Sequence, residues 1–378
     1  MTERPLRDRT PETLRSVGRE AARIGVRART ARWPDHTRLF AVGDRGAWSV
    51  EEDAQHLLAT GQRLGLEVGP ASWARFAERQ SVFLTSHFEA LGPHWTGSSH
   101  RLATAYLHGR PGTPGAPEFD ECFQALQARP ESLARIQVTH AEMEALVLGA
   151  GVPANRVFRI PLGVDLENFP LRTASSREDA RGALGIPTSA FLVGSFQKDG
   201  VGWDEGLEPK LVKGPDVFVS VVERVREPIP ELAVLLTGPA RGYVRTELER
   251  LGIPTTHVLA RTRAELMRAY HALDAYVVAS RQEGGPKAVL ESMASGVPLV
   301  STRVGQAQEL VADGANGMLR DVEDADALAA AVVEIAESEA LRDALAAAGR
   351  VTAERYALER LDPLWAALLD GFVERAPA

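Results

Sequence analysis

The stretch from Leu273 to Arg303, LDAYVVASRQEGGPKAVLESMASGVPLVSTR, decides the fold of this chain. Its apolar opening predicts a strand buried on both faces, and a loop containing Gly284 and Gly285 follows. Pro286 stands where a helix tolerates proline, at the first helical position, and the helix is expected to end near Gly296. A second apolar run completes a βαβ unit, so the stretch predicts a parallel sheet.

The glycine-bearing turn of this unit is a candidate ligand site, because open α/β sheets bind ligands at the carboxyl ends of their strands. Gly284 and Gly285 have no Cβ, so a ligand can approach their backbone closely. The helix start beside Lys287 presents unpaired N–H groups that suit a phosphate. Glu283 precedes the turn, and Glu291 follows about two helical turns later. Carboxylates accept hydrogen bonds from sugar hydroxyls, so the turn suits a ligand with both phosphate and sugar.

The lysines of this chain are few and clustered. Among its 43 lysine and arginine residues, the only lysines are Lys198, Lys210, Lys213 and Lys287. Three of them follow an expected strand at 191–195, and the fourth follows the glycine turn. A lysine ammonium is a compact point charge that suits phosphate neutralisation. The cluster therefore indicates an anion site, with accidental clustering as the alternative.

Several motifs, taken in this order, resemble the retaining glycosyltransferases of family 4, which have the GT-B fold. SRQEGGPKAVLESMASGVP is similar to the E-x7-E signature of that family, with Glu283 and Glu291 as its acids. IPLGVD at 160–165 and KGPD at 213–216 are similar to its IPNGVD and KG-x-D segments. The resemblance covers most of the chain from about Leu107 onward. It implies an α/β fold with two Rossmann-like parallel-sheet domains facing across a cleft, and a C-terminal helix that crosses back to the N-terminal domain.

The resemblance also implies site residues. His108 ends an expected strand beside Gly109, where the family places an active-site histidine, and the implied catalytic residues are His108, Glu283 and Lys213. Where the family has Gly-Arg after the first strand of its second domain, this chain has FQKD, which leaves the first phosphate ligand open between Lys198 and Lys213. The implied contacts to the nucleotide sugar come from Lys198, Lys213, Arg241, Arg261, Gly284, Gly285, Lys287 and Glu291. The family needs no metal, and no Asp-x-Asp motif adjoins an expected strand end.

Composition narrows the class of protein. A chain of 378 residues is long enough for two domains. Its 44% hydrophobic and 25% charged residues are typical of a soluble globular protein. No run approaches the roughly 18 apolar residues of a membrane span, and the Arg-rich start lacks a secretory signal. Cys122 is the single cysteine, which excludes an internal disulfide and favours the cytoplasm. The net charge of −8 argues against a nucleic-acid partner.

Three units are expected along the chain. They are an N-terminal acceptor-binding domain at 1–175, a nucleotide-sugar-binding domain at 176–355, and a crossing helix at 356–378. The polar segment Leu171–Arg181 is expected to be the linker between the domains. Further strands are expected near 38–43, 81–85, 103–107, 136–139, 157–160, 233–237 and 257–260, with helices between several of them.

Two other segments carry expectations. Pro11 to Arg29 has helical apolar spacing and many arginines. Such a helix can lie on an acidic membrane, but its apolar face lacks Trp and Phe, which favours packing on the domain. The glycine-rich loop 200–209 is longer than a simple connection and is expected to shape donor or acceptor selectivity.

The predicted activity is transfer of a sugar from a nucleoside diphosphate sugar to an acceptor. The donor can be a UDP or GDP sugar, the acceptor a small metabolite, a glycan or a lipid, and no cofactor is expected besides this co-substrate. Three alternatives remain: a nucleotide-sugar epimerase, a phosphorylase with pyridoxal phosphate, and a catalytically silent nucleotide-sugar-binding protein. A carboxylate-pair hydrolase is disfavoured because it needs no phosphate site.

Overall fold

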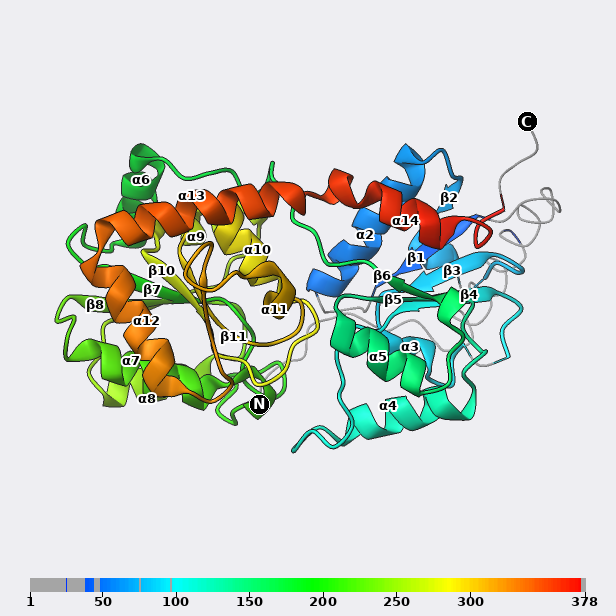
Figure 1. Ribbon diagram of the computed structural model, residues 1–378, viewed down its shortest axis with the longest axis horizontal. Coiled ribbons are helices and arrows are strands. Elements are labelled where there is room, and N and C mark those ends of the chain that lie inside the picture. The colour runs from blue at the N-terminus through cyan, green and yellow to red at the C-terminus, as the bar shows by residue number, and fades with distance from the viewer. Residues whose placement is uncertain (1–24, 26–37, 44–47, 75, 96, 375–378) are drawn as a thin grey trace, which may run out of the picture.

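Two parallel six-stranded sheets, each with helices on its faces, lie side by side in the computed structural model (Figure 1). The structure describes residues 25, 38–43, 48–74, 76–95 and 97–374, and the side chains of 48–50 are not described. The helix expected over Pro11 to Arg29 lies outside the described residues, apart from Gly25, and so does the turn at 44–47. The α/β architecture of two Rossmann-like domains expected from the sequence is present.

The N-terminal sheet has the order β2-β1-β3-β4-β5-β6, and every neighbouring pair in it is parallel. Its strands are β1 (Leu39–Val42), β2 (Val68–Gly69), β3 (Ser81–Leu84), β4 (Arg101–Ala105), β5 (Arg135–Val138) and β6 (Val157–Arg159). Its helices are α2 (Trp48–Arg63), α3 (His87–Ala90), α4 (Pro117–Ala128) and α5 (Ala141–Gly149). The two-residue strand β2 was not expected, since so short a strand leaves no alternation in the sequence.

The C-terminal sheet has the order β12-β11-β10-β7-β8-β9 and is also parallel throughout. Its strands are β7 (Phe191–Ser195), β8 (Leu232–Thr237), β9 (Thr255–Val258), β10 (Ala275–Val278), β11 (Leu299–Thr302) and β12 (Met318–Arg320). Its helices are α6 (Ala174–Leu184), α7 (Pro215–Arg226), α8 (Gly242–Arg250), α9 (Arg263–Ala272), α10 (Lys287–Ala294), α11 (Ala307–Leu310), α12 (Ala325–Glu337) and α13 (Glu339–Arg355).

Most of the segment Leu171–Arg181 is helical rather than the linker that its polar composition suggested, because α6 begins at Ala174. Thr173 caps α6 by accepting a hydrogen bond from the backbone N–H of Ser176, and α6 packs on α9 in the C-terminal domain. Arg181 is fully buried and its Nη2 lies 2.5 Å from Asp274 Oδ2. Polar residues here serve a helix cap and an internal ion pair, so the crossing between the sheets lies in 160–173, a few residues before the expected boundary.

The C-terminal segment returns to the N-terminal domain. After α13, the short helix α14 (Asp362–Leu369) packs on the first sheet, and Leu368, Leu369 and Phe372 share an apolar cluster with Leu39 and Phe83. In Figure 1 this red segment runs along one edge of both domains. The expected crossing helix is therefore present, and it ties the two sheets together through buried apolar contact.

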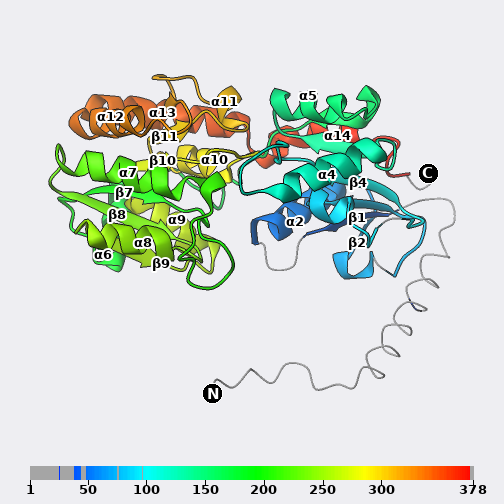
Figure 2. The same ribbon diagram turned by 90° about the horizontal axis from the view of Figure 1, so that it is seen from below.

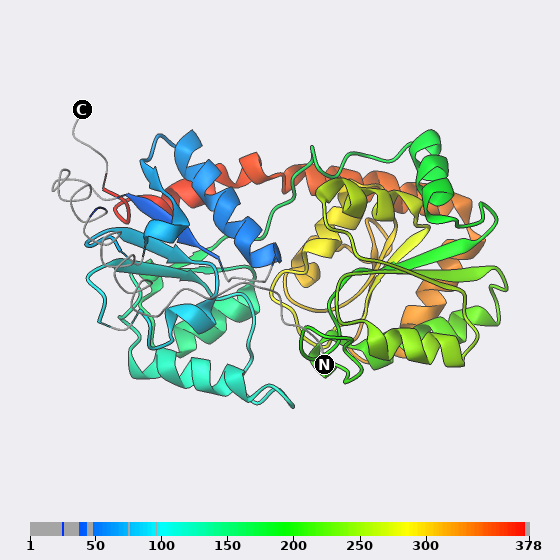
Figure 3. The same ribbon diagram turned by 180° about the vertical axis from the view of Figure 1, so that it is seen from behind.

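The domains also touch at the carboxyl ends of their sheets. Thr139, just after β5, donates a hydrogen bond from Oγ1 to the carbonyl oxygen of Gly284 at 3.0 Å. The backbone N–H of Leu162 donates to Gln306 Oε1 at 2.8 Å. From behind, the blue α2 of the first domain begins close to the yellow helices of the second (Figure 3). The boundary thus brings both sets of strand ends together.

Candidate functional site

The topological switch point of the second sheet lies between β7 and β10. β10 pairs with β7 on one side, Ala275 opposite Val193, and with β11 on the other, Tyr276 opposite Leu299. The chain runs outward from this pair in both directions, so their carboxyl ends leave a crevice for a ligand. Gln197 follows β7 and Ser280 follows β10, which places the glycine-bearing turn at this point.

Two of the residues predicted to be catalytic form an ion pair at the switch point. Lys213 Nζ lies 2.7 Å from Glu283 Oε1 and 2.6 Å from Oε2. Ser280 Oγ donates a hydrogen bond to Glu283 Oε1 at 2.8 Å, and Gln197 Nε2 donates to the carbonyl oxygen of Lys213 at 2.7 Å. The sequence assigned the lysine to phosphate and the glutamate to sugar hydroxyls, whereas the structure joins them. A ligand that separates the two side chains can bind both the ammonium of Lys213 and the carboxylate of Glu283.

His108 lies across the domain boundary from this pair, two residues after Tyr106. Its ring centroid is 5.4 Å from that of His87, 5.7 Å from Phe88 and 5.6 Å from Phe119. Burial, followed by the positive charges of Lys213 and Lys210, lowers the pKa of His108 from its ordinary value of 6.5 to about 3. The imidazole is therefore neutral near pH 7 and faces the lysines.

The low pKa of His108 makes a prediction for stability. As the pH falls from about 6.5 towards 3, the unfolded chain binds a proton that the folded chain refuses, so the free energy of unfolding falls. Between pH 7 and 5.5 the wild type should lose about 1 kcal/mol more than His108→Gln. Urea unfolding at several pH values measures this difference. Parallel stability curves for the two proteins would show that His108 titrates normally.

Glu291 lies on α10 with two partners from α9. Tyr270 donates its hydroxyl hydrogen to Glu291 Oε2 at 2.9 Å, and Arg263 Nη1 lies 3.6 Å from Oε1. Burial raises the pKa of Glu291, while the charge of Arg263 and the hydrogen bond from Tyr270 act in the opposite direction. Arg263 also pairs with Glu52 of α2 in the other domain. Arg263 was not predicted from the sequence. The only feature that could have indicated it is its place shortly after the expected strand at 257–260.

Lys287, predicted to bind phosphate, contacts acidic side chains of the N-terminal domain. Its Nζ lies 2.6 Å from Asp53 Oδ1 and 3.3 Å from Glu52 Oε2. Both acids stand near the start of α2, where the helix dipole favours negative charge. The sequence did not indicate this pairing, since the lysine and the two acids belong to different domains.

The remaining lysines differ in their surroundings. Lys198 Nζ lies over the ring of Trp203, 4.3 Å from its centroid, and Trp203 is 62% exposed. Lys210 is half-buried, and its side chain makes no hydrogen bond or ion pair with another residue of the described ranges. Burial and then the charges of Lys213 and Lys198 lower the pKa of Lys210. The structure thus brings three lysines together, and only Lys213 has a carboxylate partner among the described residues.

The two arginines that the resemblance implies as contacts to the nucleotide sugar have different surroundings. Arg241 is 1% exposed, its Nε lies 2.9 Å from Asp199 Oδ1, and its Nη1 donates to the carbonyl oxygens of Ser195 and Thr237. Its guanidinium is committed to holding the loop at 199–210 against the turn after β8, which favours a structural role. Arg261 is exposed, and its backbone N–H donates to Glu265 Oε2 at 2.6 Å.

Gly284 and Gly285 lack a Cβ because the other domain occupies that space. A Cβ on Gly284 would lie 2.0 Å from the carbonyl oxygen of Leu107, and one on Gly285 would lie 2.7 Å from Leu162 Cδ1. Both neighbours belong to the N-terminal domain, and the first is backbone that cannot move aside. In this arrangement these glycines allow the domains to meet, and the helix after them begins at Lys287 with Pro286 as its cap.

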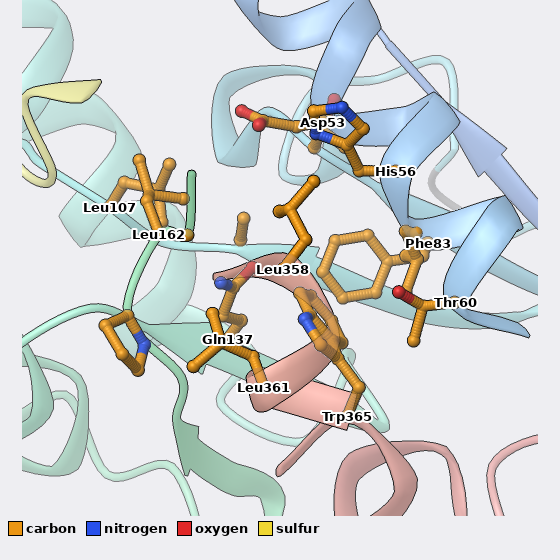
Figure 4. A pocket seen from close by; sticks show the side chains of 15 residues that line it. Asp53, His56, Thr60, Phe83, Leu107, Gln137, Leu162, Leu358, Leu361 and Trp365 are labelled. Carbon is orange, nitrogen blue, oxygen red and sulfur yellow. The ribbon is translucent and has the colours of Figure 1, made fainter. Parts of the chain in front are cut away.

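Two cavities lie near the boundary. The larger, of about 540 Å³, has walls from both domains and includes Glu283. The smaller, of about 40 Å³, lies among Asp53, His56, Gln137 and Trp365 beneath the returning C-terminal segment (Figure 4). A volume of about 40 Å³ holds only a few water molecules. The larger cavity is therefore the one that can hold a substrate.

The described part of the chain contains no group of three or more His, Cys, Asp or Glu side chains placed to hold a metal ion. It also contains no helix with the length and apolar character that crossing a bilayer requires.

Comparisons with known proteins agree with this architecture. Residues 206–338 match the family model "Glycosyl transferases group 1". A D-inositol 3-phosphate glycosyltransferase of Corynebacterium urealyticum is 32% identical over 232 residues, 58% of this chain and 52% of that protein. One from Xylanimonas cellulosilytica is 31% identical over 260 residues, 65% of this chain and 58% of that protein. The chain thus spans little more than half the length of these curated relatives.

Solved structures share the fold at low sequence identity. HepE from Anabaena, in complex with UDP and glucose, has a TM-score of 0.71 at 16% identity and covers 89% of this chain and 100% of its own. Sucrose-phosphate synthase from Thermosynechococcus elongatus has a TM-score of 0.64 at 21% identity, with 77% of this chain and 73% of its own covered. These likenesses establish the GT-B fold.

Proposed function

We propose that this chain is a glycosyltransferase of the group 1 family that moves a sugar from a nucleoside diphosphate sugar to an acceptor. The observation that carries the proposal is the pair of Lys213 and Glu283 at the switch point of the second sheet, near enough to His108 of the first domain for the charge of Lys213 to lower the pKa of that histidine. The family match at 206–338, the curated relatives and the fold support it.

The reaction requires stabilisation of a leaving group. The bond between the anomeric carbon and the β-phosphate oxygen breaks, and a bond to an acceptor hydroxyl oxygen forms. Negative charge develops on the departing diphosphate, so cations placed beside it lower the barrier. Lys213 and Lys210 would supply this charge without a metal. We further propose retention of configuration, with the departing phosphate accepting the proton of the acceptor hydroxyl.

The two carboxylates would hold opposite ends of the donor. Glu291, on α10, would accept hydrogen bonds from the ribose hydroxyls, as the E-x7-E resemblance implies. Glu283 would accept from hydroxyls of the transferred sugar once the diphosphate draws Lys213 towards itself. A charged acceptor makes hydrogen bonds about twice as strong as a neutral one, which suits both positions.

Lys210 is a better second diphosphate ligand than Lys198. Its ammonium lies near Lys213 and has no carboxylate partner among the described residues, whereas that of Lys198 rests on Trp203. Three neighbouring ammonium groups repel one another, and an anion of two phosphates relieves that repulsion. Lys210 would thus take the place of the family's arginine, which this chain lacks.

The test of the proposal is a thermal-shift panel of UDP, GDP, UMP and GMP. Ligands that bind only the folded state raise its melting temperature. One nucleoside diphosphate should raise it by several degrees and its monophosphate by less, and Lys210→Met should narrow that gap. UDP deserves the first trial because HepE was solved with it. No shift with any of the four would refute the proposal.

Product analysis separates the remaining enzyme classes. Incubation with UDP-glucose alone should leave the sugar unchanged apart from slow hydrolysis, whereas an epimerase would convert it without an acceptor. A silent binding protein would show the thermal shift and no turnover with any acceptor. The names of the relatives make a phosphorylated cyclitol one acceptor to include.

A further inference from the structure

The larger cavity is built by both domains beside Glu283. From the N-terminal domain come the loop 110–114 and the start of α5 with His140, Glu142 and Met143. The C-terminal domain contributes Leu211, Val212, Asp216, the segment 281–283, the turn 303–305, Gln308, Val322 and Glu323. A volume of about 540 Å³ lies within the range of small-molecule sites.

This cavity lies on the opposite side of Glu283 from the residues assigned to the nucleotide. Its walls include neither Glu291 nor Lys198, Lys210 or Lys287. In Figure 2, α5 and α11 lie along one face of the molecule, α2 and α9 lie towards the other, and α10 stands between them. Glu291 and its partners belong to α10, α9 and α2. A donor held there leaves the cavity open to the acceptor.

The positive charges on the cavity walls are paired with carboxylates on the walls or next to them. Arg281 makes a two-pronged pair with Asp216, at 2.8 and 2.6 Å, and its Nε lies 2.6 Å from Glu323. Arg110 pairs with Glu142, and Arg303 Nε lies 3.0 Å from Asp321 Oδ1. Each of the three wall arginines therefore already has a carboxylate partner.

The neutral state of the remaining groups completes this balance. Burial lowers the pKa of His140, so its ring carries no charge near pH 7. Glu283, the fourth wall carboxylate, pairs with Lys213. No unpaired cation stands on the described walls to attract a phosphate group, which contrasts with the lysine cluster on the nucleotide side.

The walls do suit a ring with many hydroxyl groups. Paired carboxylates keep lone pairs that accept hydrogen bonds from hydroxyls, and arginine forks keep N–H groups that donate to them. Gln282, whose Oε1 accepts from Thr113 Oγ1 at 2.7 Å, and Gln308 add amide donors. Met143 and Val304 offer apolar surface for the C–H face of a ring.

We propose that this cavity is the acceptor site and that the acceptor presents an uncharged polyhydroxylated ring, a sugar or a cyclitol, rather than a phosphorylated one. The inference rests on the proposed function, because it takes Glu283 as the residue beside the transferred sugar. It differs from what the names of the relatives suggest, since their acceptor carries a phosphate.

The experiment measures binding of four probes to the protein saturated with UDP, or with GDP if the panel selects it. The probes are myo-inositol, D-glucose, myo-inositol 1-phosphate and D-glucose 6-phosphate. Saturation-transfer NMR detects their binding, and calorimetry measures their affinities. At least one neutral ring should bind, and more tightly than its phosphate ester. Gln308→Trp, which fills the cavity from an exposed position, should weaken that binding at least about tenfold.

Matched variants serve as controls. Ala315→Trp introduces the same side chain at an exposed position outside the cavity walls. Arg303→Gln should weaken probe binding several-fold, while Arg224→Gln should not. Arg224 has similar exposure and also pairs through Nε with one aspartate, but it lies on α7 away from the cavity. Affinity for the nucleoside diphosphate should stay unchanged in all four variants.

The results distinguish failure of the acceptor inference from failure of the proposed function. Tighter binding of a phosphate ester, no binding of either neutral ring, or equal binding by Gln308→Trp and Ala315→Trp would overturn the acceptor inference. If the wild type bound neither UDP nor GDP, the proposed function would fail first, and that outcome is seen before any probe is added.

Discussion

Replacing Lys213 by methionine is expected to lower kcat for sugar transfer by about 100- to 1,000-fold, the usual effect of removing one stabilising donor from a developing oxyanion. Methionine keeps the length of the side chain and removes the charge that faces Glu283 at 2.6 Å. The rate of nucleoside diphosphate release at saturating donor measures the effect. Lys198→Met removes a lysine of the same cluster that rests on Trp203, and its kcat should fall less than about tenfold.

A double variant separates the chemistry from the fold. Lys213→Met leaves the carboxylate of Glu283 without its cation and mostly buried, since its side chain is 11% exposed, with Ser280 as its remaining hydrogen-bond donor in the described site. An unpaired carboxylate in such a place destabilises the fold. Adding Glu283→Gln should restore stability while transfer stays slow. Normal turnover in the single variant, or recovery of turnover in the double variant, would contradict the role of Lys213.

Replacing Glu291 by glutamine is expected to weaken the affinity for the nucleoside diphosphate by about 10- to 100-fold. The reason is the loss of hydrogen bonds from the ribose hydroxyls to a charged acceptor, each worth about 1.5–3 kcal/mol. Calorimetry with UDP and with 2′,3′-dideoxy-UDP measures how much the ribose hydroxyls contribute to the affinity. The wild type should prefer UDP strongly, and Glu291→Gln should bind both ligands almost equally.

The fold should survive this change. Burial raises the pKa of Glu291, so its ionised form costs stability near pH 7, and a neutral amide avoids that cost. Arg263 keeps Glu52 as a partner, and Tyr270 keeps an oxygen to which it can donate. An unchanged ratio of the two affinities would place the ribose elsewhere, even if overall binding weakened.

Both predictions depend on contacts between segments that are distant in the chain. Lys213 and Glu283 are separated by 70 residues and meet because β7 and β10 are neighbours at the switch point. The sequence predicted both residues from the motifs around them. It did not predict that they pair, because pairing depends on where two side chains point after the sheet has formed.

The residues that the sequence missed, or to which it gave another role, have the same explanation: their contacts depend on where side chains point after folding. The family resemblance implied that Arg241 contacts the nucleotide sugar, whereas the structure turns its side chain inward to Asp199. Arg263 carried no motif, yet it lies between Glu52 of one domain and Glu291 of the other. Lys210 belonged to a recognised cluster, and the contact of Lys198 with the ring of Trp203 distinguishes the two lysines.

The sequence by itself determined the parallel α/β architecture, the βαβ unit around Gly284 and the positions of Glu283 and Glu291 along it. These follow from apolar periodicity and from turn and helix-start residues, which act over a few neighbouring positions. The tertiary structure alone decided that Ala174–Leu184 is a helix, that Gly284 makes room for the backbone of Leu107, and that a charge-balanced cavity adjoins Glu283. The physical reason is range: burial and charge pairing depend on groups that only folding brings together.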